Sequence, residues 1–159
     1  DIVIDITRNG GAAIVNFSMN EEEVRLFMKE PYIATASDGS ARIPNSTVPH
    51  PRSYGTFPRK IGRYSLDDEI IPLAQAIRSS SGLPADILRL PERGYVKKGY
   101  YADLVIFDPK TFRDKATFDK PHQYSPGVRY LFVNGQLAID DGKATTALPG
   151  RVLRHQAAK

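Results

Sequence analysis

The sequence predicts an α/β fold in which a parallel strand–helix–strand unit comes first and an antiparallel β module follows. Its 159 residues are about the length of one ordinary domain, and a chain of this length can bury a core. Two observations predict the fold. Apolar runs flank an amphipathic helix near the N-terminus, and two turn dipeptides, Asn134-Gly135 and Asp141-Gly142, separate short β-type segments near the other end.

The first ten residues have no initiating methionine and resemble the last turns of a helix closed by Gly10. We therefore expect the chain to be a segment of a longer protein. The apolar run at residues 12–17 has the length and β-branched content of a buried parallel strand.

A helix is predicted next, with Asn20 as its N-cap, Glu23 completing a capping box and Pro31 ending it. Residues 32–36 form a second apolar run. Strand, helix and strand joined by short connections imply a parallel sheet, and in such sheets working residues lie just beyond the carboxyl ends of strands. Asp38 occupies that position.

Residues 38–64 are predicted to be a long loop because they are rich in proline and glycine. Loops of this length are usually functional or disordered, and the aromatic residues in this one favour function. We expect its cations to cluster around its only acid, Asp38; they are Arg42, Arg52, Arg59, Lys60 and Arg63.

A helix is expected from Ser65, which with Asp68 resembles a capping box, to the glycine at position 82. Pro72 is expected to kink it, and its expected inward face is Ile70, Leu73, Ala74 and Ile77. A short helix at 84–88 follows. Beyond Pro91, strands are predicted at 102–107, 128–133, 136–139 and 143–146.

Two residue types at these positions suggest binding or catalysis. Asp38 is held between a strand and a glycine, where an acid can face a crevice; the alternative is an Asx-turn that only caps the strand. Arg52 follows a proline, so its guanidinium is on a stiffened segment and could bind a carboxylate in fork geometry; the alternative is an ordinary exposed arginine.

Other site chemistries find little support. The three histidines show no metal-binding spacing: His50 is expected to make a structural hydrogen bond, His122 to lie in a turn and His155 in a solvated tail. The lack of cysteine excludes a disulfide, a thiolate metal site and a cysteine nucleophile. The chain has no glycine-rich phosphate loop and no serine-hydrolase elbow.

The charge balance does not favour nucleic acid. The formal net charge is +4, but Arg151, Arg154 and Lys159 supply three of those charges at the C-terminus, so the remainder is nearly neutral. No apolar run is long enough for a transmembrane helix and no signal peptide is recognisable, so neither a membrane nor a nucleic acid is an expected partner. The cytoplasm is the default location.

Five segments together resemble the C-terminal part of the N-acyl-D-amino-acid deacylases, or D-aminoacylases, of the amidohydrolase superfamily. They are Ser37-Asp38-Gly39, His50-Pro-Arg-Ser-Tyr-Gly-Thr-Phe-Pro-Arg59, Gly82-Leu-Pro-Ala85, Gly99-Tyr-Tyr-Ala-Asp-Leu-Val-Ile-Phe-Asp-Pro109 and Val133-Asn-Gly135. The first two are specific to this group, and the fourth and fifth are shared by many amidohydrolases.

The resemblance implies the end of a (β/α)₈ TIM barrel followed by a small β-sandwich. Residues 1–90 would supply the last two barrel strands with their helices, and residues 91–159 the C-terminal share of the sandwich. A complete barrel needs about 250 residues, so the remainder of the enzyme would be the partner of this chain. Oligomerisation is the alternative way to cover the open barrel edge.

The resemblance also implies a zinc-dependent hydrolysis in which zinc-bound hydroxide attacks the amide of an N-acyl-D-amino acid. Asp38 would move the proton to the leaving amine and could also be a metal ligand, and Arg52 would bind the substrate carboxylate. His50, Tyr54 and Gly39 would shape the same pocket. The other zinc ligands of the family have no counterpart here, so the isolated chain is expected neither to hold stoichiometric zinc nor to be active.

This chain departs from the family pattern at 79–81, where three serines replace a basic residue, a methionine and a threonine; we expect a local change at a helix end. Two alternative functions remain at this point. One is a dihydroorotase-like or hydantoinase-like amidohydrolase, which shares the 99–109 segment but not the 50–59 motif. The other is a non-catalytic carboxylate-binding or scaffold module.

Overall fold

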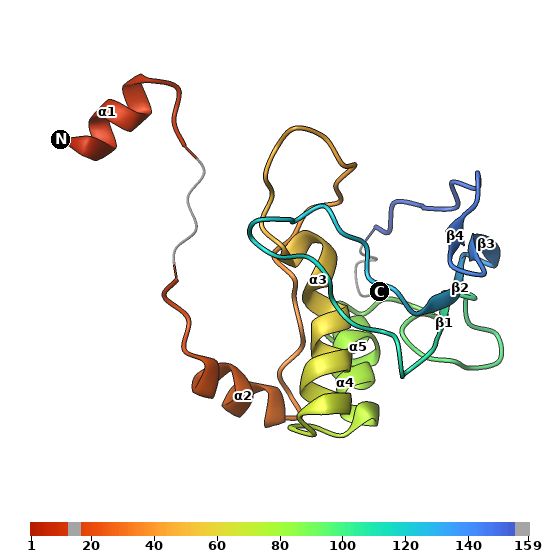
Figure 1. The fold of residues 1–159 in the computed structure, drawn as a ribbon. Coiled ribbons are helices and arrows are strands. Elements are labelled where there is room, and N and C mark those ends of the chain that lie inside the picture. The colour runs from red at the N-terminus through yellow and green to blue at the C-terminus, as the bar shows by residue number, and fades with distance from the viewer. Residues whose placement is uncertain (13–16, 155–159) are drawn as a thin grey trace.

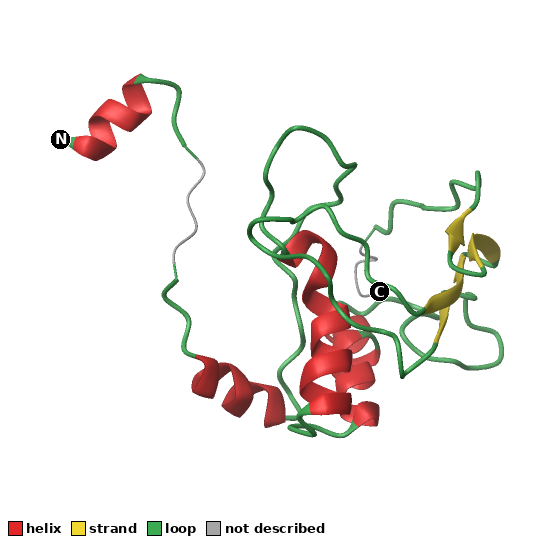
Figure 2. Ribbon diagram, in the orientation of Figure 1, coloured by secondary structure: helices red, strands yellow, loops and turns green. Residues whose placement is uncertain are grey.

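The computed structural model describes residues 1–12 and 17–154, which form a helical part and a small antiparallel sheet (Figures 1 and 2). The described elements are α1 (Ile2–Arg8), α2 (Glu21–Lys29), α3 (Arg52–Arg59), the π-helix η1 (Lys60–Asp67), α4 (Leu73–Ser80), α5 (Gly82–Ile87), β1 (Leu104–Phe107), β2 (Val128–Val133), β3 (Gln136–Asp140) and β4 (Lys143–Ala144). Helices and a sheet together agree with the predicted α/β class.

The core joins the helical part to the segments that flank the sheet. Phe112, which follows β1, packs with Ile61 of η1, with Ile71 just before α4 and with Ala76 of α4. Phe107 of β1 stacks against Phe112, with the two ring centroids 4.8 Å apart. This packing fixes the segment after β1 against η1 and α4. The predicted division at residue 90 stays a prediction.

The first helix ends as the sequence predicts. Gly10 has φ +96°, its amide donates to the carbonyl of Thr7, and the amide of Gly11 donates to that of Ile6. These two bonds make a Schellman motif, which satisfies the last carbonyls of a helix. α1 buries no residue and lies apart from the other helices (Figure 1). The strand predicted at 12–17 lies almost wholly outside the described residues, because 13–16 are not described.

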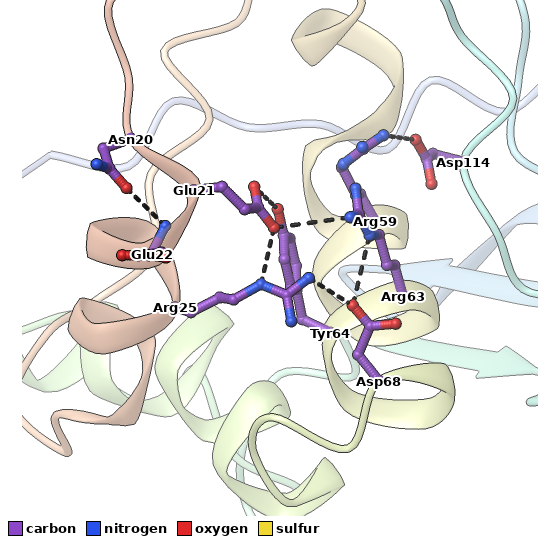
Figure 3. Close-up of polar contacts among 9 residues, drawn as sticks. All are labelled: Asn20, Glu21, Glu22, Arg25, Arg59, Arg63, Tyr64, Asp68 and Asp114. Carbon is purple, nitrogen blue, oxygen red and sulfur yellow. Dashed lines mark hydrogen bonds and ion pairs between the residues drawn. The ribbon is translucent and has the colours of Figure 1, made fainter.

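The helix predicted after Asn20 is confirmed as α2. The Asn20 side chain accepts hydrogen bonds from the amides of Glu22 and Glu23, so it is the N-cap. An ion pair ties α2 to the end of η1, as Figure 3 shows: Arg25 contacts Asp68, the residue after η1, at 2.8 Å. Arg25 also pairs with Glu21 within α2 at 3.0 Å. The hydroxyl of Tyr64 donates to Glu21 over 3.0 Å.

The prediction of a strand at 32–36 is wrong for the structure described: residues 33–40 form neither strand nor helix. A β-strand needs a hydrogen-bonding neighbour, and the only described sheet is built from residues beyond 103. One long-range backbone contact remains, from the Thr35 amide to the carbonyl of Ser79 over 2.8 Å. It holds the segment that precedes Asp38 against the end of α4.

The prediction of a loop across 38–64 is wrong in its second half, because α3 begins at Arg52 and η1 follows it at Lys60. The His50 ring nitrogen Nδ1 accepts a hydrogen bond from the Arg52 amide over 3.0 Å, and the N-cap residue Pro51 already has helical dihedral angles. Pro58 lies inside α3, and the wider π-helical turns of η1 follow it. Prolines therefore mark a helix start and an irregular interior here.

The helix predicted to open at Ser65 begins later. Ser65 lies within η1, Glu69 has φ +50°, and α4 starts at Leu73 directly after Pro72, which therefore precedes the helix instead of kinking it. The later start shifts the inward face. Ala76 and Ser79 are buried, whereas Ala74 and Ile77 are exposed, contrary to prediction. The predicted short second helix is confirmed as α5.

The antiparallel module is confirmed as a sheet of order β1-β2-β3-β4. Both turn dipeptides have positive φ at both residues, with Asn134 at +50° and Gly135 at +78°, as type I′ hairpins require. The Asn134 amide donates to Asp103 over 2.7 Å, and Arg93 contacts both Asp103 and the Asn134 side chain. This network locks the first hairpin to the start of β1. No helix among the described residues has the length and hydropathy to cross a bilayer.

Candidate functional site

The two residues singled out in the sequence meet in the structure. Asp38 and Arg52 form an ion pair in which Oδ2 of Asp38 lies 2.7 Å from an η-nitrogen of Arg52. The Asp38 side chain is 83% exposed and that of Arg52 is 43% exposed, so both remain accessible to a ligand. Asp38 also has φ +48°, an unusual value for a residue with a side chain.

Gly39 allows this pair to form because it brings its backbone against the first turn of α3. A Cβ atom at Gly39 would lie 2.9 Å from Cα of Ser53 and 3.1 Å from the carbonyl oxygen of Arg52. No side chain fits there. The Ser40 amide also donates to the hydroxyl of Ser53 over 3.3 Å. Gly39 therefore shapes the site through close backbone approach.

His50 positions Arg52 instead of facing the ion pair directly. Its Nδ1 accepts the Arg52 amide, and its ring packs edge-to-face on Phe118 at 5.0 Å. Burial lowers the pKa of His50 and the Arg52 guanidinium lowers it further, against the opposing effect of Asp38. A neutral ring suits the acceptor role at Nδ1. The structural hydrogen bond expected of His50 is present.

Tyr54 lies on α3 next to a histidine that the sequence did not place at the site. Its hydroxyl is 2.8 Å from Nδ1 of His122, and its ring packs edge-to-face on those of His122 and Tyr124. Burial raises the pKa of Tyr54, so its hydroxyl keeps its proton. His122 was expected to be only a turn residue. No local pattern could have revealed a contact across 68 positions.

A cavity of about 200 Å³ borders the ion pair and is lined by Gly39, Ser40, Arg52, Ser53 and Tyr54 among others. A larger cavity of about 560 Å³ also borders α3 and is lined in part by His50, Arg59 and Asp114. Volume alone would favour the larger cavity. Both cavities are lined by an arginine that pairs with a carboxylate, but Asp114 beside the larger cavity is only 16% exposed, whereas Asp38 is 83% exposed. We regard the smaller cavity as the candidate site because its pair leaves the carboxylate accessible to a ligand.

The predicted cation cluster around Asp38 is wrong for Arg59, Lys60 and Arg63, whereas Arg52 does pair with Asp38. Arg59 pairs with Asp114 at 2.8 Å, and Arg63 lies near Glu21 and Asp68. Helix formation disperses these side chains around α3 and η1, since neighbours in sequence point about 100° apart on a helix.

Lys60 is the most unexpected member of that group, because it is buried with only 4% of its surface exposed. Its ammonium group contacts the hydroxyl of Thr35 and donates to that of Ser79 over 2.7 Å. Burial lowers the pKa of Lys60 to about 8. It therefore joins the segment before Asp38 to α4, and does not face the site.

The described residues do not fit a metal centre by themselves. Residues 1–12 and 17–154 contain no group of three histidine, cysteine, aspartate or glutamate side chains placed to bind one ion. Asp38 offers one carboxylate, and a guanidinium already occupies one of its oxygens. Any metal at this site therefore needs ligands from elsewhere.

Comparison with known proteins places these residues in context. The family model described as "Amidohydrolase family" matches residues 6–139. An N-acyl-D-glutamate deacylase of Alcaligenes xylosoxydans xylosoxydans is 37% identical over 157 residues, which cover 99% of this chain and 31% of that protein.

Two solved structures share the fold. A crystal structure of D-aminoacylase matches with a TM-score of 0.77 and 42% identity, over 84% of this chain and 28% of that one. The second is an N-acyl-D-glutamate deacylase from Bordetella bronchiseptica, solved with zinc and a phosphonate inhibitor that mimics the tetrahedral intermediate. It matches with a TM-score of 0.71 and 37% identity, over 84% of this chain and 28% of that one. The chain thus spans less than a third of the length of these relatives.

Proposed function

Because the chain belongs to the amidohydrolase family, we propose that it is the C-terminal portion of a metal-dependent hydrolase that deacylates N-acyl-D-amino acids. The observation that supports this most is the Asp38–Arg52 pair at the edge of a cavity, which offers a proton carrier beside a carboxylate-binding group. The relatives named above are deacylases, which favours this reaction over the hydantoinase-like alternative.

Arg52 is the proposed anchor for the α-carboxylate of the substrate. A guanidinium presents five donors in a planar fork that matches a carboxylate, and the contact with Asp38 uses one of its nitrogens. The hydrogen bond to His50 and the start of α3 fix the Arg52 backbone. Binding therefore selects substrates that have a carboxylate next to the scissile amide.

Asp38 is the proposed proton carrier. In amide hydrolysis, water adds to the carbonyl carbon, its proton passes to a base, and the same proton then goes to the nitrogen as the C–N bond breaks. The products are a carboxylic acid and a D-amino acid. An exposed carboxylate 2.7 Å from the carboxylate anchor can serve both transfers without moving far.

Zinc is the proposed metal of the complete protein, since it is the metal in one related structure. Its ligands would come mainly from sequence outside the described residues, with Asp38 as one possible contributor. We propose that the remainder of the same protein completes the site and continues the TIM barrel, of which residues 1–90 would form the C-terminal end. The sheet β1–β4 would belong to its β-sandwich.

The test is an assay of the complete gene product with N-acetyl derivatives of D-glutamate, D-aspartate and D-leucine and with their L enantiomers. Release of the free D-amino acid, with at least 100-fold preference over the L form, is the expected result. Absence of hydrolysis with all six compounds would reject the proposal. In that case, if calorimetry detects binding of the same compounds, the result would support the carboxylate-binding module instead.

A further inference from the structure

His122 joins two segments that border the candidate site. It lies between β1 and β2, its Nε2 is 2.7 Å from the carbonyl oxygen of Thr47, and its Nδ1 is 2.8 Å from the hydroxyl of Tyr54. Thr47 belongs to the loop 41–50, which connects the Asp38 turn to α3. One side chain thus holds both the loop and the helix from a part of the chain about 70 positions away.

The chemistry of the two partners assigns the protons. A carbonyl oxygen only accepts, so Nε2 of His122 bears a proton and donates it to Thr47. In the neutral ring Nδ1 then has a lone pair, and the Tyr54 hydroxyl donates to it. Both bonds therefore form with one tautomer of a neutral histidine.

Packing restricts the same rings. The planes of Tyr54 and His122 meet at 84° with centroids 5.6 Å apart, and Tyr124 packs on Tyr54 at 5.5 Å. Edge-to-face contacts of this kind fix a ring's orientation in addition to burying it. The Tyr54 hydroxyl also lies 3.5 Å from the carbonyl of Arg42, at the start of the same loop.

We infer that His122 is a positioning residue that holds Tyr54 and the loop 41–50 in the arrangement that forms the cavity beside Asp38 and Arg52. Tyr54 lines that cavity two residues after Arg52. The expected effect of this positioning on enzyme kinetics rests on the proposed function. Loss of the two bonds makes the cavity less preformed, so substrate binding weakens while the proton transfer at Asp38 continues.

The experiment compares the complete gene product with H122F, which keeps an aromatic ring and removes both bonds, and with Y54F, which removes only the hydroxyl. With N-acetyl-D-glutamate, each variant should raise KM about tenfold, the usual effect of losing a hydrogen bond, with kcat within about twofold. The double variant Y54F/H122F should be no worse than H122F alone, because H122F already lacks the contact that Y54F removes. H122Q, which keeps a donor toward Thr47, should restore part of the affinity.

The exposed Tyr130 on β2 provides a matched control, since Y130F also removes one tyrosine hydroxyl and should change neither constant. An unchanged KM in H122F, or fully additive effects in the double variant, would overturn the inference. If the wild-type protein hydrolyses none of the substrates, the proposed function fails independently. Amide hydrogen exchange then decides the matter: exchange in 41–50 should quicken in H122F and not in Y130F, and equal exchange would refute the positioning role.

Discussion

The ammonium group of Lys60 and the hydroxyl of Ser79 are joined by a hydrogen bond of 2.7 Å in the interior between η1 and α4. Thr35 completes the contact from the segment that leads to Asp38. Among the described residues no ion pair involves Lys60, so this cation is buried against hydroxyl groups alone. Desolvation without a counter-charge accounts for its lowered pKa.

This burial predicts an unusual dependence of stability on pH. The pKa of Lys60 is about 8 in the folded protein, against 10.5 for the free side chain. Between these values the unfolded chain binds more protons than the folded one, so the contribution of Lys60 to stability rises with pH. The full rise is on the order of 3 kcal/mol, because each pKa unit corresponds to about 1.4 kcal/mol.

Urea unfolding of the wild-type protein and of K60M at pH 7, 8, 9, 10 and 11 measures this rise. The quantity compared at each pH is the difference in free energy of unfolding between the two proteins. K110M, which removes an exposed lysine, is the control and should follow the wild type. A constant difference between wild type and K60M across this range would show that Lys60 titrates normally.

Replacement of Arg52 by lysine should weaken substrate binding more than it slows the reaction. Lysine keeps the charge and loses the planar fork, so two-point binding of a carboxylate is no longer possible. We expect KM for N-acetyl-D-glutamate to rise about 10- to 100-fold, corresponding to a loss of one charge-assisted hydrogen bond or slightly more.

Arg59 offers a matched comparison for that variant, because it lies on the same helix but pairs with a different carboxylate. Its partner is Asp114, at a distance of 2.8 Å. R59K should leave KM close to the wild-type value. Equal increases in both variants would mean that α3 was disturbed generally and that Arg52 has no specific role in binding.

The polypeptide of 159 residues should bind no stoichiometric zinc when it is produced alone. The described residues contain no cluster of three metal ligands, and one carboxylate beside a guanidinium is a poor site for a dication. Elemental analysis after dialysis against micromolar zinc measures this directly. One tightly held zinc ion per chain would show that the chain contains a complete metal site.

Local patterns predicted the elements whose formation depends on neighbouring residues. Asn20 caps α2 through its own side chain, and the Asn-Gly and Asp-Gly pairs adopt positive φ in both hairpins. In each case the side chain or glycine acts within a few residues of its position. The pairing of Asp38 with Arg52 was anticipated less directly, from two stiffened positions in one loop.

Elements that depend on distant partners were not predictable in the same way. Residues 32–36 have strand composition, but no described strand lies beside them to complete the hydrogen bonding. Prolines at 51 and 58 suggested a loop, whereas the hydrogen bond from the Arg52 amide to His50 and the packing of η1 favour a helix. The contacts of Lys60 and His122 join segments 19 to 75 positions apart, and nothing local to either residue indicates its partner.

The most direct test of the account is the rate at which the complete gene product and its D38A variant release D-glutamate from N-acetyl-D-glutamate. The account predicts turnover by the wild-type protein and a fall in kcat of about 10²- to 10⁴-fold in D38A, the usual contribution of a proton carrier. Circular dichroism and bound metal, measured on both proteins, separate this loss from misfolding. A D38A protein that is folded, equally metallated and as active as the wild type would contradict the assignment of Asp38 and with it the proposed site.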